Sequence, residues 1–474
     1  MINFDDYKCA QGVFSHFLGI SEIPRVSGNT AAIADYLVKF ATEHSLEYIR
    51  DGKDNVVIKK PASKGYEGRP TVILQGHTDM VGAKRADIDF DFDTEKIKVL
   101  RDGDFLCADG TTLGGDDGIA VAYALAILES REAEHPDIEA IFTSDEEIGL
   151  LGAGALDCSS LKGRIMINID SDNEGVFTVG CAGGLRADAI LPLSRDVEGG
   201  AYYKLTLSGF AGGHSGIEIN EGHENAIKVL ADMLSAIPSI RISDISGGEA
   251  DNAIPRYAEC VFTTDTDTSS EIFAAIESVI EKYKAAEPSA KFELTAIPAA
   301  TIPFTKSATK RLLYLIESEP TGVIAMSRNI EGLVETSLNL GMIKIEGNAA
   351  HLTFSIRSSV EASKAELTER VGNIARENGA SFSTRGEYPA WEYKSDSRLR
   401  ETMISVYKEL YGKEPKVEAI HAGLECGIFA GKLEGLDCVS IGPDGFDIHT
   451  PEERLSIPSV ARVWEFLLEV LKRI

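Results

Sequence analysis

Five residues of the types that bind divalent metals lie in short segments rich in glycine and acidic residues. In chain order they are His77, Asp116, Glu147, Asp170 and His449. Two imidazoles and three carboxylates are the ligands that a pair of divalent cations needs when one carboxylate bridges them. Such a pair polarises a carbonyl group and acidifies a water molecule, which is hydrolytic chemistry. The pattern therefore predicts a metal-dependent hydrolase.

Two further carboxylates stand beside these candidates. Asp79 follows His77 by two residues, and Glu146 directly precedes Glu147. An acid near a metal-binding histidine can orient its ring, and an acid beside a metal-binding glutamate can take a proton from water. We therefore expect Asp79 to orient His77 and Glu146 to be the general base. Each segment alone also has an ordinary structural explanation, such as a surface turn or a helix cap.

Three of the segments follow apolar runs that we interpret as buried strands, namely 71–75, 138–143 and 164–169. Helical patterns alternate with these runs, which is typical of a doubly wound α/β sheet. The carboxyl ends of the strands in such a sheet line the ligand crevice, so these acids and imidazoles should meet there. The same alternation returns near the carboxyl end of the chain. We expect one catalytic α/β domain made of residues 1–185 and 390–474.

Between these two parts, the pattern changes. From Tyr202 to Ala296 the expected elements follow the order strand, helix, strand, strand, helix, strand. This order is typical of a ferredoxin-like lobe, and the segment is long enough for two such lobes. We therefore predict an inserted α+β lid domain over residues 186–389.

Composition excludes several classes of function. The net charge of −28 argues against nucleic-acid binding, which needs a basic face. No apolar run approaches the ~18–20 residues that span a bilayer, and the first residues do not have the pattern of a signal peptide. The seven cysteines show no CxxC spacing, which fits reduced thiols and a cytoplasmic location.

Several motifs together resemble a known family, the di-zinc peptidases that include carboxypeptidase G, aminoacylase and several bacterial dipeptidases. Within it, the chain is most similar to the bacterial dipeptidases that cleave Xaa-His dipeptides. The resemblance covers nearly the whole chain and rests on the motifs at 74–79, 110–118, 145–149, 168–171, 180–184 and 421–427. Two departures, Thr450 for a usual Ser and Gly115 for a usual Ala, change no ligand.

The resemblance implies a role for each candidate. Asp116 would bridge two zinc ions, with His77 and Asp170 on one ion and Glu147 and His449 on the other. It also implies a cis peptide bond after Asp116. Other divalent metals such as Co²⁺ or Mn²⁺ would suit the same ligands.

The resemblance also implies four substrate-binding residues, most of them in the predicted lid. His214 would donate a hydrogen bond to the oxyanion, and Asn252 would bind the substrate. Arg357 would bind the terminal carboxylate with its planar guanidinium. Gly423 would contact the substrate through its backbone.

The sequence thus predicts a cytoplasmic zinc dipeptidase that acts on small unblocked peptides and has neither a nucleic acid nor a membrane as partner. A second copy of the chain is a candidate partner, because a small lid would need His214 from another subunit. Two alternatives stay open: an aminoacylase-like or tripeptidase-like enzyme, and a catalytically silent metal-binding scaffold. The intact Glu146 beside Glu147 argues against the scaffold, which has no need of a base.

Overall fold

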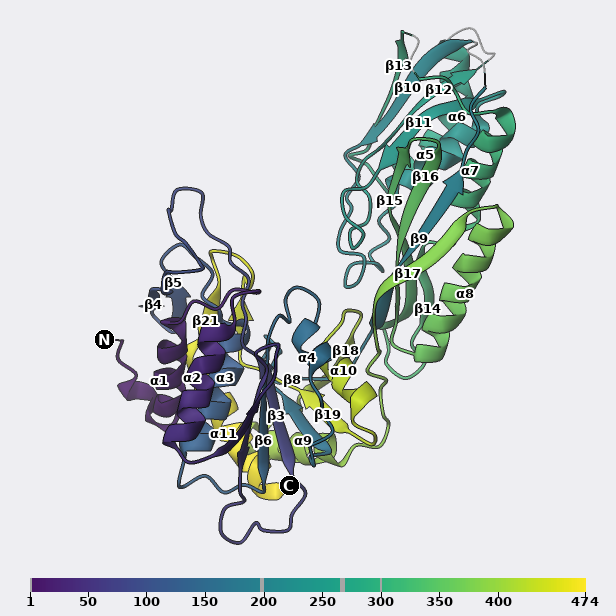
Figure 1. Cartoon of the computed structure of the whole chain (residues 1–474). Coiled ribbons are helices and arrows are strands. Elements are labelled where there is room, and N and C mark those ends of the chain that lie inside the picture. Colours follow the sequence, from purple (N-terminus) through teal and green to yellow (C-terminus); the bar gives the residue numbers. More distant parts are fainter. Residues whose placement is uncertain (1, 197–199, 265–268, 299–300) are drawn as a thin grey trace. The chain divides into compact units, whose positions relative to one another are not determined.

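The computed structural model describes residues 2–196, 200–264, 269–298 and 301–474, and Figure 1 shows its elements. The chain folds into two compact units. The first contains Met1–Gly180, Tyr393–Ala419 and Leu424–Ile474, and the second contains Cys181–Glu392 and Ile420–Gly423. Among the described helices, none has both the length and the apolar character that crossing a membrane requires. That one unit is a catalytic domain and the other a lid stays a prediction.

The larger sheet of the first unit is parallel at its centre. In spatial order its eight described strands are β1 (Glu47–Arg50), β2 (Val56–Lys60), β6 (Ile138–Thr143), β3 (Val72–His77), β7 (Ile165–Asn168), β19 (Asp437–Ser440), β8 (Val176–Cys181) and β18 (Lys416–Ile420). Strands β6, β3, β7 and β19 pair in parallel, whereas β1, β2 and β8 add antiparallel pairs. Strand β3 is buried along its whole length, as expected of a parallel strand covered on both faces. The predicted α/β architecture is confirmed.

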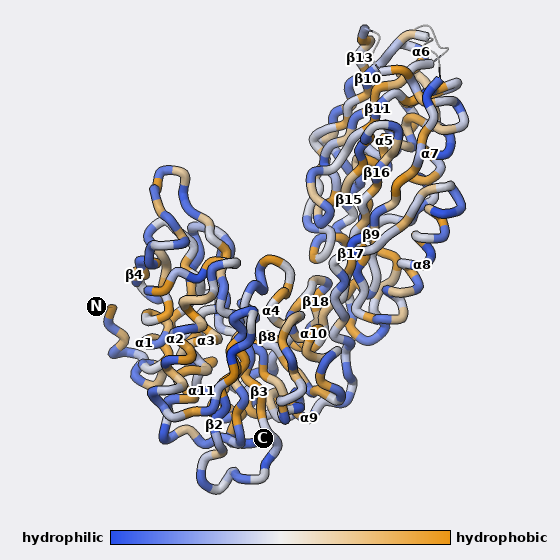
Figure 2. Tube along the Cα trace, in the orientation of Figure 1, coloured by the Kyte–Doolittle hydropathy of each residue, from blue (hydrophilic) through white to orange (hydrophobic). Residues whose placement is uncertain are grey.

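Helices of the first unit pack against this sheet or against one another and enclose the first core. They are η1 (Asp5–Ala10), α1 (Gln11–Ser21), α2 (Ala31–Glu43), α3 (Gly115–Glu129), α4 (Leu151–Ala155), α9 (Arg398–Tyr411), α10 (Glu425–Lys432) and α11 (Ile457–Arg473). Helix α3 is buried from Asp117 to Leu128 and contacts both α1 and β3. Helix α11 has one apolar face, and polar and apolar positions alternate along it in Figure 2. Because α3 is buried and contacts β3, the residues at its start have a fixed position relative to that strand.

A small antiparallel sheet in the first unit carries the loop with His449. Its order is β20 (Gly445–Phe446), β21 (Arg454–Ser456), β5 (Phe105–Ala108) and β4 (Val99–Asp102). Strands β4 and β5 form the hairpin that the Asp-Gly pair at 102–103 predicts. His449 lies in the loop that connects β20 to β21, so the small sheet anchors this loop at both ends.

The described strands of the second unit form one nine-stranded sheet built from two lobes of the same topology. The first lobe contains β10 (Ala201–Ser208), α5 (Ala226–Ala236), β11 (Arg241–Gly247), β12 (Ala258–Thr264), α6 (Ser269–Lys284) and β13 (Lys291–Ile297). Its strand order, β13-β10-β12-β11, is that of a ferredoxin-like fold. The lobe predicted from the sequence is therefore confirmed.

The second lobe encloses the first in sequence. It contains β9 (Gly183–Pro192), α7 (Lys306–Ser318), β14 (Gly322–Met326), β15 (Val334–Glu346), β16 (Ala349–Ser358), α8 (Glu361–Glu377) and β17 (Ser381–Tyr388). The order β15-β16-β9-β17 repeats the ferredoxin-like order, and β14 adds to β15. A contact between Gly247 and Ile343 joins the two lobes into one sheet.

One predicted helix begins later than its sequence pattern suggests. The pattern predicts a helix over 221–237, but α5 begins at Ala226. The side chain of Asn225 accepts hydrogen bonds from the backbone N–H groups of Ile227 and Lys228, at 3.0 and 3.3 Å. This N-cap ends the preceding loop, so residues 221–225 belong to the loop that follows His214.

Candidate metal centre

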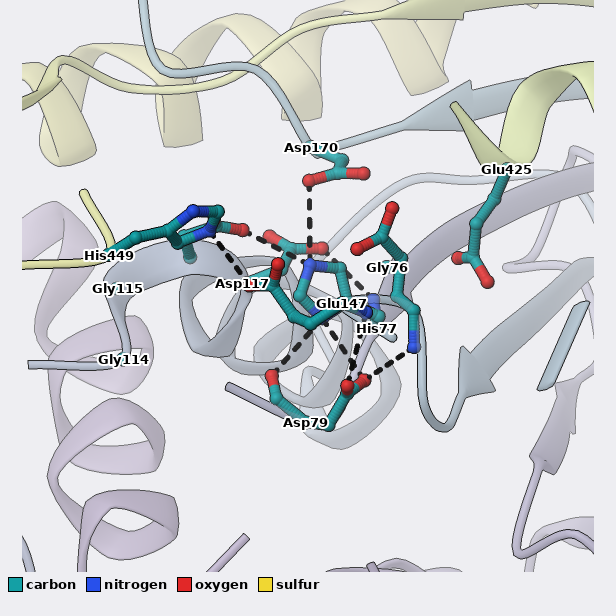
Figure 3. Close-up of polar contacts among 12 residues, drawn as sticks. Gly76, His77, Asp79, Gly114, Gly115, Asp117, Glu147, Asp170, Glu425 and His449 are labelled. Carbon is teal, nitrogen blue, oxygen red and sulfur yellow. Dashed lines mark hydrogen bonds and ion pairs between the residues drawn. The ribbon is translucent and has the colours of Figure 1, made fainter. Parts of the chain in front are cut away.

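Three of the predicted ligands come from neighbouring strand ends in the first unit. His77 is the last residue of β3 and pairs in register with Thr143, the last residue of β6. The chain then turns through Asp145, whose φ is +51°, to Glu146 and Glu147. Strand β7 ends at Asn168, which pairs with Gln75, and Asp170 follows it. Parallel strands thus bring the acids and His77 to one edge of the sheet, as Figure 3 shows for the labelled residues.

Asp116 lies between two imidazoles at the start of α3. Its Oδ1 is 3.1 Å from Nε2 of His77, and its Oδ2 is 3.0 Å from Nε2 of His449. The peptide bond between Asp116 and Asp117 is cis, as the resemblance implies. One carboxylate therefore faces a different imidazole with each oxygen, which is the arrangement of a bridging ligand.

The predicted ligands form two groups that share Asp116. His77, Asp116 and Asp170 have ligand atoms within 4.8 Å of one another, and so do Asp116, Glu147 and His449. In the second group, Nε2 of His449 is 3.0 Å from Oε1 of Glu147. A third group of the same compactness joins His77 with Glu146 and Glu147. All five predicted ligands thus converge in the first unit, and Glu146 lies among them.

Asp79 is buried behind His77 and holds the loop that carries the two glutamates. Its Oδ1 is 3.4 Å from Nδ1 of His77. The same carboxylate accepts hydrogen bonds from the backbone N–H of Glu146 at 3.0 Å, that of Glu147 at 3.3 Å, and the hydroxyl of Ser27 at 2.8 Å. Burial opposes ionisation, but the hydrogen bond and charge of His77, together with the hydrogen bonds from Glu146 and Ser27, outweigh it and lower the pKa of Asp79. Asp79 therefore positions a predicted ligand and the predicted base together.

The electrostatics of the centre reflect many carboxyl groups in a small buried volume. Burial raises the pKa of Glu146 to about 8, and the neighbouring Glu425 and Glu147 act in the same direction. Burial and the charge of Asp117 raise the pKa of Asp170. Hydrogen bonds with Asp116 and Glu147 raise the pKa of His449 to about 10. Such crowding is relieved when divalent cations neutralise the carboxylates, so the donor set fits a metal site.

Two buried ionic groups that the sequence analysis missed hold the turn before Asp116. The carboxylate of Glu453 accepts hydrogen bonds from four consecutive backbone N–H groups, those of residues 113–116, over 2.7–3.4 Å. The guanidinium of Arg25 donates to the carbonyl oxygens of Thr78 at 2.9 Å and Gly114 at 2.5 Å. Glu453 has one weak sequence signal, its place four residues after His449. Arg25 has none, because its partners are more than 50 positions away.

A third group that the sequence analysis missed, Glu425, lies beside the predicted ligands. Gln75, two residues before His77, donates to Oε2 of Glu425 at 2.5 Å, and the hydroxyl of Thr143 donates to the same oxygen at 2.6 Å. Glu425 is the first residue of α10 and is fully buried. Figure 3 shows it beside the centre. It links the ends of β3 and β6.

The four predicted substrate-binding residues lie in the second unit. His214 forms an isolated bridge with Ala253, next to Asn252. Arg357 is near the end of β16 and is 5% exposed. Gly423 belongs to the short segment Ile420–Gly423 that packs with this unit. Two pairs of sequence-distant residues thus come together here. His214 lies beside Asn252. Arg357 and Gly423 are linked through Tyr388, which contacts Arg357 and whose ring would lie 2.8 Å from a Cβ at Gly423.

Comparison with known proteins places the chain in a family. Residues 73–473 match the model of peptidase family M20/M25/M40. The chain is 36% identical over 473 residues to the cytosol non-specific dipeptidase of Escherichia coli (strain K12), covering 98% of each protein. It is 35% identical to the aminoacylhistidine dipeptidase of Vibrio alginolyticus, whose crystal structure covers 98% of both chains with a TM-score of 0.89. A Staphylococcus aureus tripeptidase, 16% identical over 98% of each chain with a TM-score of 0.56, shares the fold. The predicted resemblance is confirmed, and the chain belongs to peptidase family M20/M25/M40.

Proposed function

We propose that this protein is a metal-dependent dipeptidase that hydrolyses unblocked dipeptides with two zinc ions. The observation that carries the proposal is the pair of ligand groups that share Asp116, with Glu146 close to His77 of one group and Glu147 of the other. Similarity over 98% of the chain to a cytosol non-specific dipeptidase and to an aminoacylhistidine dipeptidase supports the substrate class. Xaa-His dipeptides are therefore the first substrates to test.

The two groups assign the ligands of each ion. His77 and Asp170 would hold one zinc, Glu147 and His449 the other, and Asp116 both. Imidazole nitrogens and carboxylate oxygens are usual zinc ligands, and Co²⁺ or Mn²⁺ would suit them as well. When bound, such a pair acidifies a water molecule and polarises the peptide carbonyl.

Glu146 is the proton carrier of the proposed reaction. Its backbone N–H is fixed by Asp79, and its carboxylate lies within 4.8 Å of ligand atoms of His77 and Glu147. It takes the proton of the attacking water and then delivers a proton to the leaving amine. Asp79 fixes the ring of His77 through Nδ1, which leaves Nε2 for the metal.

His214 has the tautomer that an oxyanion donor needs. Its Nδ1 accepts hydrogen bonds from the backbone N–H groups of Gly216 and Ile217, at 3.2 and 3.3 Å. The ring proton is therefore on Nε2. Burial and the charge of Arg357 lower the pKa of His214, so the ring is a neutral donor. We assign it to the carbonyl oxygen of the scissile bond, where negative charge develops.

Arg357 is the proposed anchor of the substrate's terminal carboxylate, because its guanidinium can donate two parallel hydrogen bonds. Asn252 and Gly423 are the proposed additional contacts. The name of the Escherichia coli relative supports a cytosolic location. Whether a second copy of the chain contributes His214 is part of the same proposal and is tested by the oligomeric state of the active enzyme.

The decisive experiment measures hydrolysis of a substrate panel by purified protein. The panel contains Xaa-His dipeptides including β-Ala-His, other dipeptides, tripeptides, N-acetylated amino acids and dipeptide amides. We expect turnover of free dipeptides that a chelator abolishes and that two equivalents of Zn²⁺ restore. Faster turnover of tripeptides or of N-acetylated amino acids would replace the proposal by the tripeptidase-like or aminoacylase-like alternative. Metal binding without any turnover would indicate a silent scaffold.

A further inference from the structure

Three neighbouring strands of the second unit place Arg357 and Tyr388 on either side of a glycine. Strand β9 lies between β16 and β17 (Figure 1). Gly184 of β9 pairs in register with Arg357 of β16 and with Tyr388 of β17. Residues that pair directly point to the same face of a sheet, and strands are spaced about 4.8 Å apart. Arg357 and Tyr388 therefore face the same side across a position that has no side chain.

The ring of Tyr388 fills the space that two glycines leave open. A Cβ at Gly184 would lie 2.6 Å from the Tyr388 hydroxyl oxygen, and a Cβ at Gly423 would lie 2.8 Å from Cε2 of the ring. Both glycines belong to motifs that the sequence analysis singled out, at 180–184 and 421–427. Their lack of side chains has a physical reason, since any other residue would displace the tyrosine.

Across Gly184 the two side chains form a hydrogen bond. Nη1 of Arg357 donates to the hydroxyl oxygen of Tyr388 at 2.9 Å. The buried Nε of Arg357 has no hydrogen-bonding partner among the described residues. A guanidinium held at Nη1 keeps its Nε and Nη2 edge for one carboxylate with two parallel hydrogen bonds. A buried donor without a partner is costly, which indicates that a ligand binds this edge.

The backbone of Tyr388 is itself held in place by a buried lysine. The ammonium group of Lys364, 1% exposed, donates to the backbone carbonyl of Tyr388 at 2.9 Å. The hydroxyl of Tyr388 accepts from Nη1 of Arg357. Tyr388 thus has a fixed backbone and a confined ring, and its hydroxyl holds one side of the guanidinium in place.

We propose that Tyr388 is a positioning residue: it holds Nη1 of Arg357, so that the Nε and Nη2 edge of the guanidinium binds the terminal carboxylate of the dipeptide. This inference rests on the proposed function and adds a second residue to its carboxylate site. It explains how one arginine, on a strand, presents a defined edge to the substrate. It also predicts that Gly184 and Gly423 act on substrate affinity through the tyrosine ring.

The test is a double-mutant cycle of Tyr388→Phe and Arg357→Ala. Both variants and the double variant are assayed on the best dipeptide of the panel and on its C-terminal amide. Tyr388→Phe keeps the ring and removes the hydroxyl. We expect it to raise KM for the dipeptide about 5–20-fold, the size of one hydrogen bond to a charged group, with kcat within about twofold. KM for the amide should hardly change, and Tyr388→Phe should have no further effect once Arg357 is alanine.

The control is Tyr257→Phe, which removes another tyrosine hydroxyl of the same unit, one bound to Glu259. It should leave both substrates unaffected. Equal loss of kcat on dipeptide and amide, or effects of Tyr388→Phe and Arg357→Ala that simply multiply, would overturn the inference. Melting temperature and metal content, measured on each variant, identify a folding defect. In that event Gly184→Ala, which displaces the ring and keeps its hydroxyl, must lower dipeptide affinity selectively or the inference fails.

Failure of the proposed function gives a different result from failure of this inference. If the wild-type protein hydrolyses no dipeptide, the proposed function is wrong and the cycle is not reached. If it does, and Tyr388→Phe keeps the wild-type preference for dipeptide over amide, only the role of Tyr388 is wrong.

Discussion

Glu453 holds the backbone of Gly115, with its Oε1 accepting the N–H of that residue at 2.7 Å. The same carboxylate binds the N–H groups on either side, so one buried anion fixes the turn that leads into Asp116. His449 lies four residues before Glu453. The turn with the proposed bridging ligand and the loop with another proposed ligand are therefore joined by this single side chain.

Glu453→Gln should weaken metal binding more than it weakens the fold. Glutamine has one acceptor oxygen, and its NH₂ group would face backbone N–H groups that need acceptors. Loss of a residue that orients ligands typically costs 10–100-fold in metal affinity. We expect a loss of this size for Zn²⁺, measured on the metal-free protein by competition with a chromophoric chelator.

Glu287 offers a matched control. It is buried in the second unit and accepts the backbone N–H groups of Ala211 and Glu224, both at 2.9 Å. Glu287→Gln should lower the melting temperature and leave Zn²⁺ affinity unchanged. If both variants lose affinity equally, Glu453 acts on stability alone and the turn does not depend on it.

Alanine variants of the adjacent Glu146 and Glu147 should lose activity for different reasons. Glu146→Ala removes the proposed base and no proposed ligand, so turnover should fall at least about 10²-fold while two metals stay bound. Glu147→Ala removes a ligand and should lower metal content as well. Metal analysis and steady-state rates on the same preparations separate the two. Equal loss of metal in both variants would mean that Glu146 binds metal, as its inclusion in the third compact group allows.

The centre was predictable from the sequence because its residues follow strand ends. Parallel strands align their carboxyl ends, so His77, Glu147 and Asp170 had to lie close together once β3, β6 and β7 were recognised. Arg25, Glu453 and Tyr388 could not be found in this way. They act on partners brought near only by the folded chain, and apart from the place of Glu453 four residues after His449, nothing in their local sequence marks them.

Helix α5 and the second lobe show the same limit for the fold. The order strand, helix, strand, strand, helix, strand was readable in 202–296, where it is continuous. The second lobe has the same order, but β9 and α7 are separated by the whole first lobe. The starting point of α5 was missed because Asn225 caps the helix within an otherwise helical pattern.

Stability should depend on pH through Glu319, which follows α7 in the second unit. Both of its carboxylate oxygens are buried without a hydrogen-bonding partner in the described part of the chain. Burial raises the pKa of Glu319 to about 8. An unfolded glutamate titrates near 4.3, so between about pH 4.3 and 8 the folded protein binds more protons than the unfolded protein. The free energy of unfolding therefore falls as the pH rises through this window, by at most about 1.4 kcal/mol per pH unit for one group.

Glu319→Gln should remove this dependence, because glutamine stays neutral. The melting temperature of the variant relative to wild type should rise steadily from pH 5 to pH 8. Glu366→Gln, at an exposed position on α8, serves as the control and should show a constant difference. If the melting temperatures of wild type and Glu319→Gln instead change in parallel from pH 5 to pH 8, Glu319 is not protonated in the folded protein.

His214→Ala and Arg357→Ala should separate the two ends of the proposed substrate. The Nε2 proton of His214 would act on charge that develops only in the transition state, so its loss should lower kcat by about 10²–10³-fold. Arg357 would bind a carboxylate that is present in the ground state and the transition state alike. Its loss should mainly raise KM, and it should erase the preference for a dipeptide over its amide.

Steady-state kinetics on one good dipeptide and its amide decide between these roles. His214→Ala should reduce kcat on both substrates to the same extent, because both have the scissile carbonyl. Arg357→Ala should change only the dipeptide, because the amide has no terminal charge to bind. An Arg357→Ala enzyme that keeps the wild-type preference would exclude the anchor role. The protein would then be better described as a broader amidohydrolase, since its specificity would no longer depend on a free carboxylate.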